Sequence, residues 1–404
     1  AQYNVSEINT DALLTASGKI NNNFTGTLSA GASTYDKKYN ESGSYGSNLI
    51  ADGIYVISNT SNQNGIYGLI RKKINSVYAN GQLGYKNYLF LDVAARNDWS
   101  STLSKGNYSF FYPSVSLSYV FTDALAIKSD LINFGKIRLS YAEAGSDASA
   151  YLTKAGYSIW NTGYNGQSFA WIQGNIPSSN LKNELKASWE IGTELRLLKN
   201  RVSVDFTYYN SSTKNQIMQV QVPAATGFAT KLVNSGEVTN KGIELYLSGT
   251  PLQSKNSINW DIALNLSNNK SKIVSLYPGL ATQILYNGDE IAIEARPGRP
   301  YGDIVGFKYL RTEDGRLLLN SDGMVQADTK RSVLGNIQPN WLAGLTNTFS
   351  FRGFVLSALV DVRNGGQIYS YSAYDQYAKG TGKFTENGDN LIEDGVIDAG
   401  GGTY

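Results

Sequence analysis

The sequence predicts an all-β protein whose long antiparallel strands form part of a large transmembrane β-barrel with long extracellular loops. Three observations lead to this prediction: the composition, a period-two alternation of apolar and polar residues, and connections that alternate between short and long. The 404 residues include 41 Gly and 28 Tyr, and only 17% are charged. This composition is typical of strands and turns rather than of helices. No run of about eighteen apolar residues is present, so no transmembrane helix is expected.

The alternation is clearest in segment 256–269, NSINWDIALNLSNN. Trp260 and Leu264 belong to one face of an extended strand, and Asp261 and Asn265 belong to the other. We expect about a dozen strands of roughly nine to eleven residues, the length that a tilted strand needs to cross a bilayer. The same pattern predicts further strands at 87–98, 112–123, 135–145, 188–197, 201–210, 242–249 and 353–363, with weaker ones near 23–34 and 76–85.

The connections between these strands alternate in length. Short turns carrying Lys, Asn or Gly are expected at 84–89, 198–202 and 350–354. Long loops are expected at 98–111, 144–187, 210–236 and 268–340. Long loops are uncommon inside a compact soluble domain, whereas short turns at one end of the strands and long loops at the other are typical of a transmembrane barrel.

The polar faces of the predicted strands carry charged residues in mid-strand. A water-filled lumen tolerates such charges, whereas an Arg or Lys facing lipid at the bilayer midplane costs about 2–4 kcal/mol. A soluble β-sandwich gives the same alternation, because one face packs on a second sheet and the other meets water; a secreted glycan-binding sandwich or adhesin therefore stays an alternative. Strand length favours the barrel. We expect these residues to face the lumen: Asp92, Arg138, Glu190, Glu194, Asp205, Glu244, Asp261 and Asp361.

Composition also limits the chemistry of the chain. The sequence has no Cys and no His, which excludes disulfides, thiolate or imidazole metal ligands and His-dependent nucleophiles. With 35 Lys and Arg against 33 Asp and Glu, and no basic run, nucleic acid is not an expected partner. We predict no enzyme, no catalytic residue, no cofactor and no metal.

Two acidic patterns in the sequence could still indicate an enzyme or a metal site. A glycoside hydrolase built on Glu190 and Glu194 is a third hypothesis, but carboxylates four residues apart on a strand lie roughly 13 Å from each other, beyond the separation that the reaction uses. The acidic segment 387–398 does not fit an EF-hand, because Ile392 falls at a ligand position. A looser calcium loop there stays open.

Two of the predicted loop segments, 156–175 and 369–380, are rich in aromatic residues. Aromatic faces beside amide and hydroxyl groups suit stacking on sugar rings or gripping a peptide. Packing of one loop on another, or on a partner lid, is an equally open interpretation. The candidate substrate-binding residues are Trp160, Tyr164, Phe169, Trp171, Tyr371, Tyr374 and Tyr377.

Several longer stretches follow one another in a consistent order. They are GRPYG…GFKY (298–309), EDGRLLL…DG (313–323) and LGNIQPNW…GGQIY (334–369), preceded by 96–103, 111–123, 136–145 and 240–251. Through these stretches nearly the whole chain resembles the SusC/RagA-type TonB-dependent outer-membrane transporters. The resemblance implies a location in the bacterial outer membrane and import of an oligosaccharide or a peptide.

The resemblance also implies partners and a domain organisation. A SusD-like surface lipoprotein would cap the extracellular loops, TonB would act through a TonB box and a plug domain, and outer-membrane lipid would surround the barrel. Members of this class need about 22 strands to close the barrel, and an open membrane sheet would leave backbone groups unpaired in hydrocarbon. We therefore expect residues 1–404 to be a partial barrel of a longer polypeptide, without the signal peptide, TonB box, plug domain and terminal strand.

Overall fold

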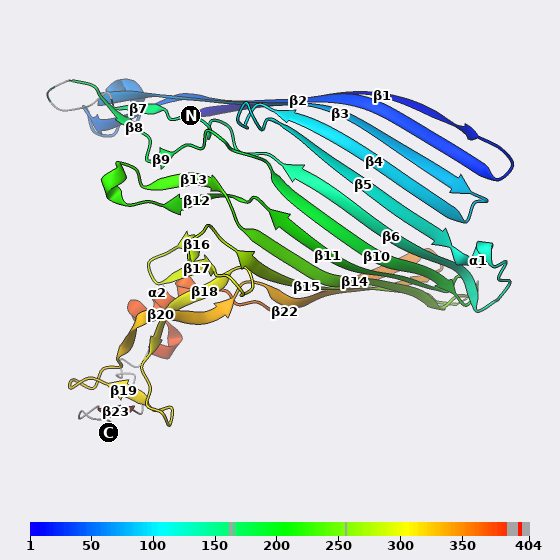
Figure 1. Ribbon diagram of the computed structural model, residues 1–404. Helices are drawn as coiled ribbons and strands as arrows, with labels where there is room; N and C mark the ends of the chain where they lie inside the picture. The colour runs from blue at the N-terminus through cyan, green and yellow to red at the C-terminus, as the bar shows by residue number, and fades with distance from the viewer. Residues whose placement is uncertain (161–164, 166, 255–256, 386–394, 398–404) are drawn as a thin grey trace.

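A computed structural model of the chain describes residues 1–160, 165, 167–254, 257–385 and 395–397. Within these residues, twelve antiparallel strands form a single curved sheet in which each strand pairs with the next one of the sheet along the chain (Figure 1). The strands are β1 (Gln2–Lys19), β2 (Phe24–Leu49), β3 (Thr60–Tyr85), β4 (Leu89–Ser100), β5 (Ser109–Val120), β6 (Ile132–Ser146), β10 (Glu184–Leu197), β11 (Val202–Lys214), β14 (Glu237–Leu252), β15 (Asn259–Ser275), β21 (Pro339–Phe351) and β22 (Phe354–Gly365).

Short and long connections alternate along the sheet, as predicted. The turns β3–β4, β10–β11 and β21–β22 lie together at one end, on the right of Figure 1, and the long connections lie at the other. Both central residues of two of these turns have positive φ: Lys86 and Asn87 in one, Arg352 and Gly353 in the other. Such turns match the right-handed twist of the paired strands. The helix α1 (Phe121–Ala124) lies in another connection at this end.

The strands are longer than predicted. They contain 12 to 26 residues rather than about nine to eleven, and β2 and β3 contain 26 each. The apolar–polar alternation marks only the part of a strand with one apolar face, whereas the backbone ladder continues wherever a neighbouring strand supplies partners. For the same reason β1 was not predicted, although it pairs with β2 over its whole length.

The long connections carry small sheets of their own. The loop 268–340, for which no strand was predicted, holds five strands within the described residues. The small sheets are β7 (Tyr157–Trp160) with β8 (Phe169–Ile172); β12 (Ile217–Gln221) with β13 (Thr230–Asn234) and β9 (Asn175–Ile176); β16 (Gln283–Asn287) with β17 (Ile291–Ala295), β18 (Asp303–Tyr309) and β20 (Ala327–Asn336); and β19 (Leu317–Leu319) with β23 (Gly395–Ile397). The helix α2 (Tyr371–Ala378) and the 3-10 turns η1 (Ile57–Asn59), η3 (Ala224–Thr226) and η4 (Lys383–Thr385) complete the described elements. Neither described α-helix has the length and apolar character needed to cross a membrane.

Apolar side chains of the large sheet are not enclosed by a second layer. In the described part of the chain the buried apolar clusters lie at the loop end, around Leu181 and around Ile273. By contrast, Leu139 and Ile191, which pair across β6 and β10, are 52% and 45% exposed. An apolar sheet face of this size needs a cover. A soluble sandwich would cover this face with a second sheet, and no such sheet packs on it within the described residues.

Candidate functional site

The strand register places all eight predicted lumen residues on one face of the large sheet. Cross-strand partners share a face, and so do residues i and i+2 of one strand. One continuous row runs from Arg138 through Gly192, Thr207 and Glu244 to Arg363. The other predicted residues join this row by the same rule: Asp92, Glu190, Glu194, Asp205, Asp261 and Asp361.

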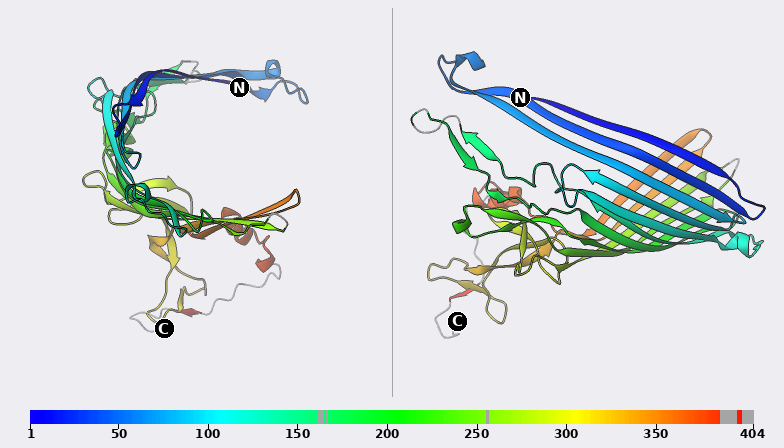
Figure 2. Two further views of the ribbon diagram at one scale, coloured as in Figure 1. Left: turned by 90° about the vertical axis from the view of Figure 1, so that its right-hand side faces the viewer. Right: turned by 45° about the horizontal axis from the view of Figure 1, so that its top comes forward.

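This polar face is the concave face of the sheet. The left view of Figure 2 shows the sheet bent into an open C. A hollow of about 900 Å³ is lined by Arg138, Asp205, Thr207, Glu244 and Asp361, all from the polar face. We call this surface the concave face. It is a long polar wall rather than a pocket with a catalytic centre.

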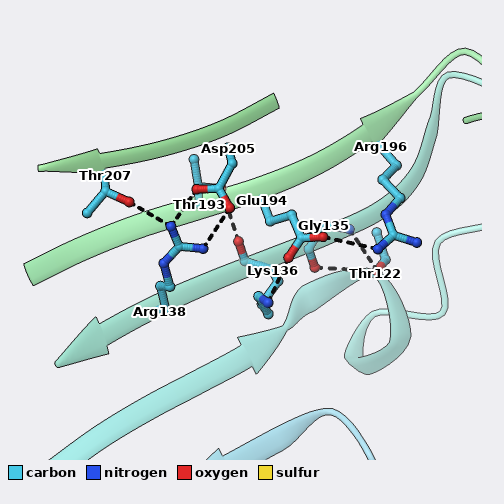
Figure 3. A network of polar contacts seen from close by, with 9 residues as sticks. All are labelled: Thr122, Gly135, Lys136, Arg138, Thr193, Glu194, Arg196, Asp205 and Thr207. Carbon is cyan, nitrogen blue, oxygen red and sulfur yellow. Dashed lines mark hydrogen bonds and ion pairs between the residues drawn. The ribbon is translucent and has the colours of Figure 1, made fainter. Parts of the chain in front are cut away.

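Arg138 connects three strands of the concave face (Figure 3). From β6 its guanidinium crosses β10 to reach β11, where it forms two hydrogen bonds to Asp205 and donates one of 2.6 Å to Thr207 Oγ1. The crossing depends on Gly192, because a Cβ at this position would lie 2.6 Å from Arg138 Nε. A forked guanidinium–carboxylate contact fixes geometry better than a single ion pair does.

Glu194 forms a second network beside the first (Figure 3). Its carboxylate lies 2.7 Å from Lys136 Nζ and accepts a 3.2 Å hydrogen bond from Arg196. Elsewhere on the concave face, Gln82 donates to Asp92 over 2.7 Å and Thr250 donates to Asp261 over 2.7 Å. Several of the mid-strand charges are thus held by neighbours on the same face, and each oxygen of the Glu194 carboxylate lies beside a different cation, Lys136 or Arg196.

We expect the Arg138–Asp205 pair to contribute about 1 kcal/mol of coupling free energy, because both side chains are about one-third exposed and water screens the pair. The measurement is a double-mutant cycle of Arg138→Ala and Asp205→Ala in the intact protein, with the unfolding free energy measured in detergent at low and high salt. The coupling should weaken as salt rises. Strictly additive single effects at low salt would contradict the prediction.

The opposite, convex face of the sheet is apolar. The row that contains Leu139 continues through Leu117 on β5 and Tyr208 on β11. Near the short-turn end, aromatic rings follow one another from Phe24 to Tyr85, Tyr88 and Tyr119, with successive centroids 4.9, 5.5 and 6.3 Å apart. Aromatic side chains at this level are typical of the girdle at a membrane interface.

A second hollow, of about 610 Å³, lies at the loop end of the sheet, and we call it the entry pocket. Ile291, Ile293 and Ile304 of β17 and β18 line it, together with Asp289 and Glu290 from the turn before β17. Tyr286, Tyr369 and Tyr371 also line it, and so does Arg363 of β22. Beside the pocket, the hydrogen bond and negative charge of Glu290 raise the pKa of the Tyr374 phenol, so this group stays a neutral donor at physiological pH.

The predicted aromatic residues do not form one cluster. Tyr371 lines the entry pocket. The ring centroids of Tyr371 and Tyr374 are 5.7 Å apart. Tyr377 is exposed on the same helix. Phe169 and Trp171 are half-exposed on β8, in a separate hairpin, and do not line the pocket. Tyr164 and the side chain of Trp160 lie outside the described residues.

The family model described as "TonB dependent receptor-like, beta-barrel" matches residues 2–395.

The chain belongs to the TonB-dependent receptor β-barrel family. Barrels of this family lie in the bacterial outer membrane, which confirms the predicted fold, family and location. The family consists of receptors rather than enzymes, so the prediction that the chain is not an enzyme is also confirmed.

Two curated relatives come from Formosa agariphila. TonB-dependent receptor P26 is 28% identical over 342 residues, which cover 78% of this chain and 34% of the relative. TonB-dependent receptor P3 is 24% identical over 332 residues, covering 74% and 32% respectively. The chain thus spans about a third of the length of the curated relatives it matches.

Solved structures show the same fold. The RagAB peptide importer in its closed-closed state superposes with a TM-score of 0.80 at 19% identity, covering 97% of this chain and 44% of that one. The outer membrane transporter YddB from Escherichia coli gives a TM-score of 0.55 at 14% identity, covering 92% and 45%. At these identities the likeness shows the fold of this TonB-dependent receptor barrel and nothing further.

Sequence reasoning missed several residues of this TonB-dependent receptor barrel. Asp289 and Glu290 lie in a segment that was predicted to be a plain loop, and Arg363 was counted only as the end of a strand. The role of Gly192 could not be predicted from the sequence, because it depends on the Arg138 side chain of the neighbouring strand passing over it. Among the described residues, no three carboxylates lie close enough together to hold a metal ion. Residues 387–394 and 398 of the acidic segment lie outside them.

Proposed function

We propose that the chain forms part of the barrel wall of an outer-membrane transporter that imports oligosaccharides or peptides with energy delivered through TonB. One observation carries the proposal: a polar concave face with a 900 Å³ hollow lies directly behind an exposed apolar face, in a single-layered sheet of the TonB-dependent receptor family. Lipid covers the apolar face, and the concave face lines the substrate path. Hydrated charges on that path cost little, whereas the same charges on the lipid face would be expensive.

The proposal extends to residues and partners. The lumen residues are the eight charged positions of the concave face, from Asp92 to Asp361, and the loop aromatics Phe169, Trp171, Tyr371, Tyr374 and Tyr377, with Trp160 and Tyr164, contact substrate. A SusD-like surface lipoprotein caps the loops, and TonB acts on a plug domain elsewhere in the polypeptide. The solved RagAB protein is named a peptide importer, which supports this class of cargo. Residues 1–404 then supply part of the barrel, since the chain spans about a third of the length of its curated relatives.

The test is uptake by cells that make the intact protein. Labelled peptide pools and labelled oligosaccharides are supplied to wild-type cells, to cells lacking the gene and to cells lacking TonB. Uptake of at least one cargo class should disappear in both deletion strains, because a substrate too large for passive diffusion needs the energised receptor. Restoring the gene should restore uptake. Unchanged uptake of both cargo classes in either deletion strain would refute the proposal.

A further inference from the structure

The entry pocket has an apolar floor built by register. Ile293 of β17 pairs with Ile304 of β18, and Ile291 pairs with Gly306, so the three isoleucines share one face of the small sheet. Ile304 is only 5% exposed. Tyr286 of β16 pairs with Ile293 and extends the same face. The isoleucine part of this floor has no donor or acceptor, so it favours an aliphatic or aromatic group over a hydroxyl. Asn287 and Gln367 supply amide groups elsewhere in the lining.

Charges of both signs line the pocket from different elements. Asp289 and Glu290 come from the β16–β17 turn, and in the described part of the chain neither forms an ion pair with a Lys or Arg. Arg363 comes from β22, where one of its nitrogens donates a 2.9 Å hydrogen bond to the carbonyl of Ile337. The rest of its guanidinium is available to a ligand. The pocket thus offers acceptors for an ammonium group and donors for a carboxylate.

Arg363 links the entry pocket to the concave face. Arg363 lines both the entry pocket and the 900 Å³ hollow of the concave face. A ligand in the entry pocket is therefore at the head of the polar wall rather than on the outer surface of the barrel. At the mouth, Ile368 is 85% exposed and Tyr371 is 59% exposed, so a ligand that covers them removes apolar surface from water.

We propose that the entry pocket binds a short peptide, with an apolar side chain on the isoleucine floor, an ammonium group at Asp289 and Glu290, and a carboxylate at Arg363. The inference rests on the proposed function and narrows its substrate class. A neutral oligosaccharide fits less well, since its hydroxyls would be buried against isoleucine and the three charged groups would lose water without a charged partner. A protein lid is disfavoured because Arg363 lines both the pocket and the hollow of the concave face, so an occupant of the pocket lies beside the polar wall.

The experiment uses the intact transporter purified in detergent and an equimolar pool of tripeptides with leucine at the central position. Half of the pool carries free amino termini and half carries acetylated ones. Bound peptides are eluted and quantified by mass spectrometry, and cellohexaose is tested in parallel as a neutral sugar. Peptides with free amino termini should be enriched about tenfold over their acetylated forms. A charge-assisted hydrogen bond from an ammonium group to a carboxylate is stronger than one from a neutral amide, and the difference corresponds to about this factor in affinity.

The variant Asp289→Asn/Glu290→Gln should abolish that enrichment while acetylated peptides still bind. The control Glu313→Gln/Asp322→Asn removes the same charge from two exposed loop carboxylates that do not line the pocket and should keep the enrichment. Equal capture of free and acetylated peptides by the wild type, binding of cellohexaose instead, or no capture of any peptide would overturn the inference. TonB-dependent uptake of an oligosaccharide in the cell assay would then leave the proposed function standing, whereas no TonB-dependent uptake would remove both.

Discussion

Replacing Leu139 by arginine is expected to destabilise the intact barrel by about 2–4 kcal/mol, which is the cost of a cationic side chain at the bilayer midplane. Leu139 is the central residue of β6, and its cross-strand partners Leu117 and Ile191 are also apolar. Neither partner has a carboxylate that could pair with the new arginine. The measurement is the fraction of heat-modifiable, folded barrel in outer-membrane extracts, supported by the denaturant midpoint in lipid vesicles.

The matched control is Ser140→Arg, one residue along the same strand. Ser140 belongs to the concave face and pairs with Glu190, so an arginine there remains in water beside a carboxylate. We expect a change of less than about 1 kcal/mol, as for other exposed charge pairs. If the two variants fold equally well, or if Ser140→Arg is the more damaging, the assignment of lipid to the convex face is wrong.

Replacing Asp303 by alanine is expected to cost the loop sheet β16–β17–β18–β20 about 3 kcal/mol of local stability, because removing one partner of a buried charged network leaves the others unpaired. Asp303 is 0% exposed. Its carboxylate accepts two hydrogen bonds from Arg299 and one of 3.0 Å from Asn336 Nδ2. Arg299 is half-exposed and can return to water, so the cost lies at the low end of the range for buried pairs.

Amide hydrogen exchange of the intact protein measures this loss. Protection should fall in β17, β18 and β20 and stay unchanged in β6, β10 and β11, because the small sheet opens separately from the large one. Since Ile304 follows Asp303 directly, peptide binding at the entry pocket should weaken as well. Asp322→Ala, which removes an exposed carboxylate from the neighbouring loop, should leave both measurements unchanged; equal loss in this control would contradict the role of Asp303.

The two faces of the strands and the two ends of the sheet could be predicted from the order of residues alone. Alternation is a local property, so Leu139 and Asp205 could be assigned to opposite faces without knowing their neighbours. The short turns were equally local, because residues such as Asn87 and Gly353 tolerate the positive φ that a two-residue hairpin requires. The resemblance in residues 296–369 supplied the family, which neither alternation nor turns could have distinguished from other barrels.

Which charges meet, and where a pocket forms, could not be predicted without the folded structure. Arg138 reaches Asp205 because the register places Gly192 between them, and register depends on hydrogen bonds between strands distant in the chain. The entry pocket joins strands β16, β17 and β18 to Arg363 and Tyr371, and its first and last lining residues, Tyr286 and Tyr371, lie 85 positions apart in the chain. A strand that contacts lipid needs one apolar face, and this requirement appears in its sequence as an alternation of apolar and polar residues. A loop in water is under no such constraint, so the strands of the small loop sheets could not be predicted from alternation.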